Sequence, residues 1–468
     1  MAGKTIAFLL ALALSLSCSA QSVIVTTAGT LIQNNRFDAA NHYLDSILKK
    51  DKKNVDALMM KGNVLLNKKW TELPTPVALT TNNESVFDTA VANLDVVPPI
   101  IPAETVKQVE AYWKKCTKLK PERTDIQKGL CNLYALALDE QKLKLQIPVL
   151  LRLLNDTTGE QAYNVAEYAR RIKERGQFDK AMSVYQYIAH LYPELAGIRA
   201  DIGSEYFYAG KFKECFNWLD SALQKKDVDE TTYLNTAFIY SQMGYYDNCQ
   251  MVLERYDREY KRSLAPFYKA LRLFADGDMA YRAKLKSFAQ QTDSNSYYQE
   301  HQLASALVAL GDTITKAEFD ALVNGGYQNW YMPLVLERAV KEKVCGATTV
   351  FGIYQSSIKN YSAATQFLDD DDGCKITEAE YRFLQLHSAY ANYMAGDNTN
   401  AEKNLSPLEK NSSAFYRHAA FYFEAKISLA KNEKLNALRL LKLIVTDKEV
   451  TKYAYLATAL QQRYGLTD

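Results

Sequence analysis

The residues that most often carry chemistry in proteins, histidine and cysteine, are few in this chain and widely spaced. There are five histidines and seven cysteines among 468 residues. None of the histidines forms a recognised metal-binding or nucleophile pattern with a nearby histidine, cysteine or carboxylate, and no CxxC pair occurs. Each histidine falls in or at the end of a helical segment: His42, His190, His301, His387 and His418. The sequence therefore predicts a protein that is not an enzyme and that holds neither a metal nor a cofactor.

The acidic run Asp369–Asp372 is the stretch that most resembles a calcium loop. Such a loop needs alternating oxygen ligands, a glycine at its sixth place and a glutamate at its twelfth. With Gly373 in the sixth place, the first ligand would be Leu368 and the twelfth would be Ala379. Neither residue has the carboxylate that a calcium loop needs at that place, so the run is predicted to be a solvated turn between helices.

The first residues predict export. One cation, Lys4, precedes an apolar run from Ile6 to Leu16 and then small residues, which is the pattern of a secretory signal peptide. Cleavage after Ala20 would leave Gln21 at the new terminus. The alternative is lipidation of Cys18, although Ser15 stands where bacterial lipoprotein signals usually carry leucine. We expect a periplasmic or outer-envelope protein that meets a membrane only indirectly or through a lipid on Cys18.

Charge excludes one class of partner. The formal net charge is +2, with 56 basic and 54 acidic residues. Nucleic-acid binding needs a basic surface, and no such excess exists here. No acidic tail indicates a cationic partner either. The sequence does not determine the oligomeric state.

A turn recurs at a fixed interval in the middle of the chain. The stretches GQFDKA, GKFKEC and GYYDNC begin at Gly176, Gly210 and Gly244, which are 34 residues apart. A small residue stands seven places before each glycine, an aromatic two places after it and another small residue five places after it. The nine positions are Ala169, Gly203, Ala237, Phe178, Phe212, Tyr246, Ala181, Cys215 and Cys249. This spacing predicts two antiparallel helices joined by a turn in which the glycine ends the first helix.

In these positions the chain resembles the tetratricopeptide repeat (TPR) family, whose unit is a 34-residue helical hairpin. The resemblance implies an all-α fold, an α-solenoid in which stacked hairpins bury faces that one hairpin cannot bury alone. It is strongest over residues 160–260, with fainter copies on both sides. Residues 71–103 hold five of the eleven prolines and interrupt the array, in place of the second helix expected after Gly62. The predicted segments are a signal peptide (1–20), N-terminal TPR-like helices (21–70), the Pro-rich insertion (71–103), degenerate helices (104–158), the best-matching units (159–260), further degenerate helices (261–325) and C-terminal helices with a capping helix (326–468).

The cysteines suggest two pairings. Cys116 and Cys131 fall at small positions of successive helices, so a disulfide between them is geometrically plausible, with two buried thiols as the alternative. Cys345 and Cys374 lie beside glycines in turns and form a second candidate pair. Equivalent positions of successive repeats are too far apart for a disulfide, so Cys215 and Cys249 are expected to be reduced core residues.

The resemblance implies a peptide-binding groove lined by the first helix of each unit. Counting from the small positions places nine side chains there: Arg170, Lys173, Glu174, Ser204, Phe207, Tyr208, Phe238, Ser241 and Gln242. They predict a basic end beside a floor of aromatic and amide groups. Packing between repeats is the alternative role for the aromatic residues. Replacing Phe207 and Tyr208 together by alanine is expected to abolish partner capture with little change in stability.

Two functions are left open. The first is an exported scaffold or adaptor that binds a protein or extended peptide in the cell envelope through this groove. The second is a glycan-binding envelope protein associated with polysaccharide uptake, favoured by the insertion and by 32 tyrosines. Within the insertion, Asp88-Thr89-Ala90 resembles a periplasmic O-glycosylation acceptor, which makes Thr89 a candidate for modification.

Overall fold

The structure is a computed structural model that describes residues 23–72, 101–156, 159–290, 297–324, 331–368, 374 and 377–466. The chain divides into two compact units at residue 198, inside helix α11. The helices of the first unit are α2 (Val23–Gln33), α3 (Phe37–Lys50), α4 (Val55–Glu72), α6 (Ala103–Leu119), α7 (Thr124–Leu136), α8 (Glu140–Leu153), α9 (Glu160–Lys173) and α10 (Phe178–Leu191).

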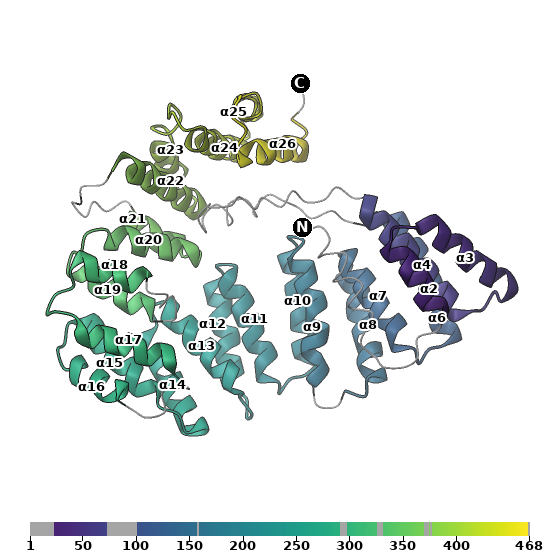
Figure 1. Ribbon diagram of the computed structural model, residues 1–468, viewed down its shortest axis with the longest axis horizontal. Helices are drawn as coiled ribbons and strands as arrows, with labels where there is room; N and C mark the ends of the chain where they lie inside the picture. Colours follow the sequence, from purple (N-terminus) through teal and green to yellow (C-terminus); the bar gives the residue numbers. More distant parts are fainter. Residues whose placement is uncertain are drawn as a thin grey trace. The chain divides into compact units, whose positions relative to one another are not determined.

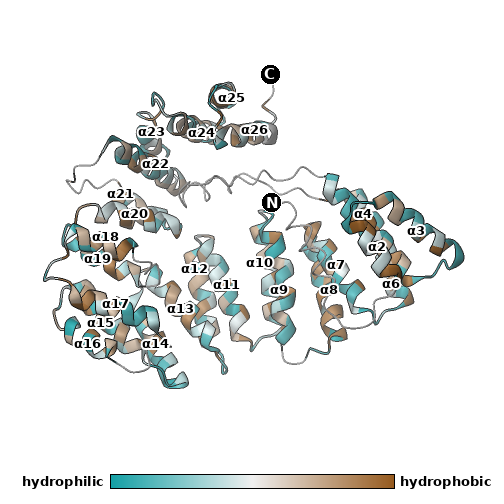
Figure 2. Ribbon diagram, viewed as in Figure 1, coloured by the Kyte–Doolittle hydropathy of each residue, from teal (hydrophilic) through white to brown (hydrophobic). Residues whose placement is uncertain are grey.

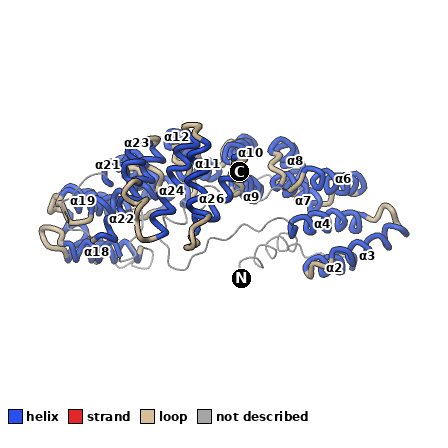
Figure 3. Tube along the Cα trace, turned by 90° about the horizontal axis from the view of Figure 1, so that it is seen from above, coloured by secondary structure: helices blue, strands red, loops and turns tan. Residues whose placement is uncertain are grey.

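The second unit continues from α11 (Ala196–Tyr208), most of which belongs to it. Its helices are α12 (Phe212–Leu223), α13 (Glu230–Gln242), α14 (Tyr246–Tyr260), α15 (Leu264–Asp276), α16 (Tyr281–Ala289), α17 (Tyr298–Ala309), α18 (Lys316–Asn324), α19 (Met332–Lys341), α20 (Ala347–Ser357), α21 (Tyr361–Leu368), α22 (Glu378–Ala395), α23 (Asn398–Leu405), α24 (Ala414–Ala430), α25 (Lys434–Val445) and α26 (Lys452–Tyr464). Figure 3 shows helices and loops, and no strand among the described residues.

Within each unit, most helices pack against the next helix along the chain (Figure 1). Hydrophobic and hydrophilic residues alternate along the same ribbons (Figure 2), because each helix buries one face against its neighbours and leaves another in water. Stacked hairpins of this kind make each unit an α-solenoid, as the repeat spacing predicts.

The three glycine turns share one local geometry. Gly176, Gly210 and Gly244 have φ values of 71°, 73° and 75°, in the left-handed region that favours glycine. After each of them, the next residue donates its N–H to the carbonyl five residues back: Gln177 to Ile172 (3.3 Å), Lys211 to Tyr206 (2.9 Å) and Tyr245 to Tyr240 (2.9 Å). These bonds satisfy carbonyls at the end of the first helix, so the turn is a Schellman-type helix end.

The same turn occurs where the sequence carries no glycine. Asn35, Leu138, Lys359 and Asn432 also have positive φ, between 57° and 63°. Each is followed by the same kind of bond: Arg36 to Leu31 (2.8 Å), Asp139 to Tyr134 (2.9 Å), Asn360 to Gln355 (2.9 Å) and Glu433 to Ser428 (2.8 Å). The hairpin turn is therefore more widespread than its glycine signature.

Small residues face the partner helix of their hairpin, as predicted. A Cβ added at Gly203 would lie 2.8 Å from Leu219 Cδ2 and 3.3 Å from the carbonyl oxygen of Cys215. Both are closer than ordinary contacts, so a larger residue would force α11 and α12 apart.

The expectation that residues 71–103 take the place of the second helix after Gly62 is wrong. A Cβ at Gly62 would overlap the indole of Trp113 in α6, whose Nε1 donates to the carbonyl of Met59 at 3.0 Å. Helix α6 thus packs on α4 as its partner, because the gap at Gly62 admits the Trp113 ring. Residues 73–100 lie outside the described part of the chain.

The predicted disulfide between Cys116 and Cys131 is not formed. Both are free and buried, and Cys116 Sγ lies 3.5 Å from the carbonyl oxygen of Val55 in α4. Cys116 thus faces α4, the helix with which α6 pairs. Burial raises the pKa of Cys116 to about 11, so it stays a thiol. Cys215 and Cys249 are also free and buried, as expected.

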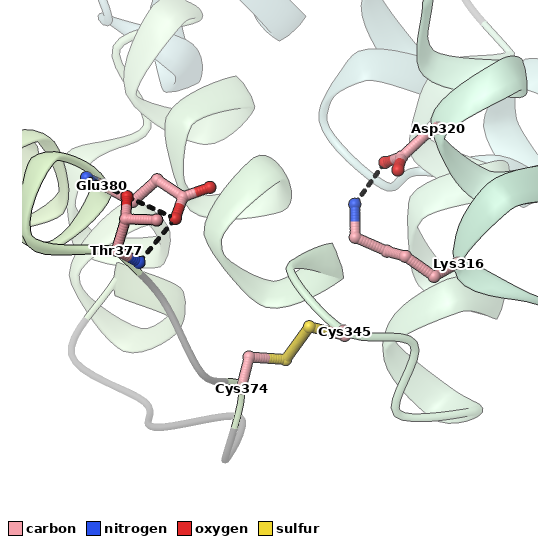
Figure 4. Close-up of a disulfide and its surroundings, with 6 residues drawn as sticks. All are labelled: Lys316, Asp320, Cys345, Cys374, Thr377 and Glu380. Carbon is pink, nitrogen blue, oxygen red and sulfur yellow. Dashed lines mark hydrogen bonds and ion pairs between the residues drawn. A yellow bond between two sulfur atoms is a disulfide. The ribbon is translucent and has the colours of Figure 1, made fainter.

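Cys345 and Cys374 are joined by a disulfide (Figure 4). It connects the residues just before α20 to the residues just before α22. Helix α22 begins at a capping box, in which Thr377 Oγ1 accepts the N–H of Glu380 at 3.2 Å and Glu380 Oε2 accepts the N–H of Thr377 at 2.7 Å. The disulfide and the cap fix both ends of the α20–α21 segment.

Buried and half-buried tyrosines connect neighbouring segments of the chain through carboxylates. The hydroxyl donates to an acid in each of these pairs: Tyr134 to Glu110 (3.1 Å), Tyr192 to Asp156 (2.6 Å), Tyr240 to Asp220 (2.5 Å), Tyr256 to Glu230 (2.6 Å) and Tyr331 to Glu300 (3.0 Å). Burial, reinforced by the neighbouring carboxylate, raises the pKa of these tyrosines above the ordinary value, so they remain donors at neutral pH. Much of the tyrosine content therefore serves the fold.

Candidate partner-binding surface

The nine residues predicted to line one groove divide between the two units. Arg170, Lys173 and Glu174 lie at the end of α9 in the first unit. The other six lie on α11 and α13 in the second unit. Each group is therefore described within its own unit.

Arg170, at the predicted basic end of the groove, is paired with acids of its own helix end. Arg170 lies between two acids of its own helix end: Nη2 is 2.6 Å from Glu167 Oε1, and Nη1 pairs with Glu174. The hydrogen bond from Arg170 to Glu167 raises the pKa of the guanidinium above its ordinary value. Both acids compensate Arg170, while Arg171 and Lys173 add further cations to the last turn of α9, so the basic end of the groove stays a prediction.

Phe207 is a packing residue and does not line a groove. Its side chain is 1% exposed. Its ring centroid lies 5.3 Å from Tyr208, 6.2 Å from Phe212 and 6.4 Å from Phe238. The alternative of packing between repeats is correct for Phe207, since the aromatic rings of α11, α12 and α13 meet around it.

Tyr208, the next residue, points to solvent. Its side chain is 59% exposed, while its ring packs edge-on against Phe207. Phe238 is half-buried beside them. We call Phe207, Tyr208, Phe212 and Phe238 the aromatic platform. It presents one large exposed ring on an aromatic base in which Phe207 is buried and Phe212 and Phe238 are half-buried.

Ser204 lies near the platform on α11 and is half-buried. Its hydroxyl donates to the carbonyl of Ala200 at 3.0 Å. The donor is used inside the helix, so Ser204 offers a partner mainly its acceptor lone pairs.

Ser241 and Gln242 are buried, which contradicts their predicted place on an open floor. Ser241 Oγ accepts from the hydroxyl of Tyr268 at 3.1 Å. Gln242 Oε1 accepts from the hydroxyl of Tyr354 in α20. Residues from later in the chain therefore cover this end of α13.

The residues that cover it come from α19 and α20, where the chain runs back toward the earlier hairpins after α18. Helix α19 passes the turn after α15, where Arg338 Nη1 donates to the carbonyl of Phe274 at 3.2 Å and Lys341 Nζ to that of Ala275 at 2.9 Å. At the turn between α13 and α14, the hydroxyl of Tyr246 donates to Glu337 Oε1 of α19 at 2.5 Å.

The return continues to the Gly210 turn. A Cβ at Gly210 would lie 3.3 Å from Lys359 Cβ, so the end of α20 reaches the turn between α11 and α12. Helices α19 and α20 thus run back along the turns of three consecutive hairpins. Because these contacts join residues more than sixty positions apart, helical spacing alone does not reveal them.

The C-terminal helices contain a polar cluster that the sequence did not indicate. His418 Nδ1 lies 2.9 Å from Thr451 Oγ1, and its Nε2 lies 3.0 Å from Asp447 Oδ2. Arg417 Nη2 donates to the same Asp447 oxygen at 2.7 Å. The residue types match an acid–base relay, but the His418 ring is fully buried and both of its nitrogens are engaged. The cluster ties α24 to the loop before α26.

The described part of the chain carries neither a metal-ligand cluster nor a membrane-spanning helix. There, no three histidines, cysteines or acids lie close enough together to hold a metal ion. None of the helices in that part is both long and apolar enough to span a bilayer. Cys18, Thr89 and the acidic run Asp369–Asp372 lie outside the described residues.

No protein-family model matches this chain, and no curated protein matches it in sequence. Among solved structures it is similar to the TPR domain of P58(IPK), at 9% identity, over 95% of this chain and 98% of that chain, with a TM-score of 0.21. It is also similar to Naa15/Naa10 bound to HypK-THB, at 13% identity, over 95% of this chain and 71% of that chain, with a TM-score of 0.27. TM-scores this low do not establish a shared fold, so the description as an α-solenoid rests on the chain's own helices and turns.

Proposed function

We propose that the protein is an exported, non-catalytic scaffold that binds a protein or extended peptide in the cell envelope. The observation that carries this proposal is the aromatic platform of the second unit. Exposed tyrosines on a well-packed base are typical of the residues that dominate binding energy at protein interfaces. Tyr208 has this character, since its ring is exposed and the ring beneath it is fixed.

The stacked hairpins support the same function. A solenoid offers a long surface on which an extended partner can contact several repeats at once. The N-terminal signal pattern supports a location outside the cytoplasm, where the partner would be another envelope protein. No observation on the described residues favours the glycan-binding alternative.

Tyr208→Ala tests the proposal. The wild-type chain and the variant are used to capture proteins from the native envelope fraction, and the captured proteins are quantified by mass spectrometry. We expect one partner to be depleted at least about tenfold by the substitution, which corresponds to about 1.4 kcal/mol.

Tyr298→Ala is the matched control, because Tyr298 of α17 is 62% exposed but lies outside the platform. It should leave capture unchanged. Equal recovery of every captured protein by wild type and Tyr208→Ala would refute the role of the platform.

A further inference from the structure

A second surface of the second unit is a cleft lined by residues of α14, α15 and α16. Its volume is about 840 Å³. The charged side chains in its lining are Glu254, Asp257, Arg258, Lys269 and Lys284. None of them belongs to the aromatic platform.

The two acids of the cleft are already engaged. Glu254 Oε1 accepts from Gln250 Nε2 at 2.9 Å. Asp257 accepts the backbone N–H groups of Leu264 at 2.9 Å and Ala265 at 2.8 Å, which are otherwise unpaired donors at the start of α15. Both carboxylates therefore serve the fold.

The three cations are not engaged. Arg258, Lys269 and Lys284 are exposed, and none makes a hydrogen bond or ion pair with another described residue. Nearby arginines differ in this respect, since each has an acidic partner: Arg255 with Glu259, Arg272 with Asp247 and Arg282 with Asp312. Three free cations from three helices thus border one cleft whose acids are occupied.

The cleft wall also holds a buried acceptor. Gln250 Oε1 is buried and has no donor among the described residues. The amide orientation is fixed, because Nε2 points to two acceptors, Glu254 Oε1 and the carbonyl of Ala265 at 3.3 Å. An unsatisfied buried acceptor is costly to the folded state, so this part of the cleft wall is polar as well as charged.

We propose that this cleft binds an extended acidic segment of a partner protein. The carboxylates of such a segment match Arg258, Lys269 and Lys284, which border the cleft from three helices. A basic or neutral segment would leave the three cations without ion-pair partners. The cleft adds a second contact surface to the proposed scaffold, and it is tested without altering Tyr208, so that failure of one surface is distinguishable from failure of the other.

The test is a fluorescence-anisotropy titration of the full chain with a short labelled peptide of alternating glutamate and leucine. We expect saturable binding that weakens about tenfold in Lys284→Glu and further in Lys269→Glu/Lys284→Glu. A lysine–leucine peptide should bind at least about tenfold more weakly, because opposite charges across an interface govern the choice of partner.

Lys286→Glu is the matched control. Lys286 lies on the same helix, is equally exposed and does not line the cleft. It should change the affinity less than about twofold, and circular dichroism should show all variants folded. Equal weakening by Lys286→Glu and Lys284→Glu would show diffuse attraction to the whole surface and overturn the proposal. Absence of saturable binding, or equal binding of both peptides, would overturn it too.

Discussion

The guanidinium of Arg338 lies directly over Gly277, so that a Cβ at position 277 would overlap Arg338 Nη1. Gly277 also has a φ of 84°, which side chains rarely adopt. The overlap with Arg338 arises because α19 packs against the end of α15, whereas the positive φ belongs to the turn itself. The two can be separated by comparison with Gly244, which has a φ of 75° and nothing within 4 Å of an added Cβ.

Gly244→Ala should therefore lower the free energy of unfolding by about 1–2 kcal/mol, the cost of a left-handed conformation. Gly277→Ala should cost clearly more, because Arg338 must move and its bond to Phe274 is lost. Urea denaturation of both variants measures the difference. Equal losses would show that α19 does not rest on this turn.

Phe207→Ala and Tyr208→Ala should separate stability from binding. Deleting the buried Phe207 ring should cost about 3–5 kcal/mol. Truncating the exposed Tyr208 ring should change stability by about 0.5 kcal/mol or less. The double variant Phe207→Ala/Tyr208→Ala, which the sequence predicted to be nearly neutral in stability, is therefore unsuitable as a test of binding alone. Chemical denaturation of each single variant measures the two stability changes. A neutral Phe207→Ala would contradict its burial.

Asp447 should stabilise the C-terminal helices in its ionised form. Hydrogen bonds from the backbone of Glu449 and from Arg417 and His418 hold the pKa of Asp447 well below its usual range. Stability from a carboxyl with a depressed pKa is present at neutral pH and is lost as the pH falls below about 3.9, the unfolded value. Asp447→Asn should cost about 2 kcal/mol at neutral pH, and the difference should shrink in acid.

Asp276→Asn controls for the loss of a carboxylate as such. Asp276 pairs with Lys341 at the surface, at 3.3 Å. Its removal should cost less than about 1 kcal/mol. If Asp276→Asn matched Asp447→Asn at every pH, the special role of the His418 cluster would be disproved.

His387 should make the protein sensitive to mild acid. It is 2% exposed, and burial lowers its pKa to about 4. The unfolded imidazole titrates near 6.5, so the unfolded state binds the proton first and stability falls as the pH drops from about 6.5 to about 4, by about 3 kcal/mol. His387→Leu should flatten this part of the stability profile, measured by denaturant midpoints across the range. An unchanged slope would rule out a buried neutral His387.

The Cys345–Cys374 disulfide should stabilise the second unit. It closes a loop with a sequence separation of 29 residues. In the chain-entropy model such a loop is worth about 3–4 kcal/mol. Cys345→Ser/Cys374→Ser should lose that amount, and dithiothreitol should lower the wild type to the same level without affecting the variant. A reductant effect that persists in the variant would point to other thiols.

Much of the local structure follows from the sequence. The turns at Gly176, Gly210 and Gly244 were predictable because a left-handed residue and small neighbours are written within a few positions of one another. The turns at Leu138 and Lys359 were not, since there the packing of the two helices imposes a positive φ on residues that do not favour it.

The hairpins, the glycine turns and the buried small residues follow from the amino-acid sequence alone, because these depend on contacts within one or two repeats. The folded structure was needed to show which of two adjacent aromatic residues is exposed, that Cys116 faces α4, and that α20 covers Gln242. These features depend on contacts between residues far apart along the chain, where loop closure and the volume left by neighbouring side chains decide the outcome.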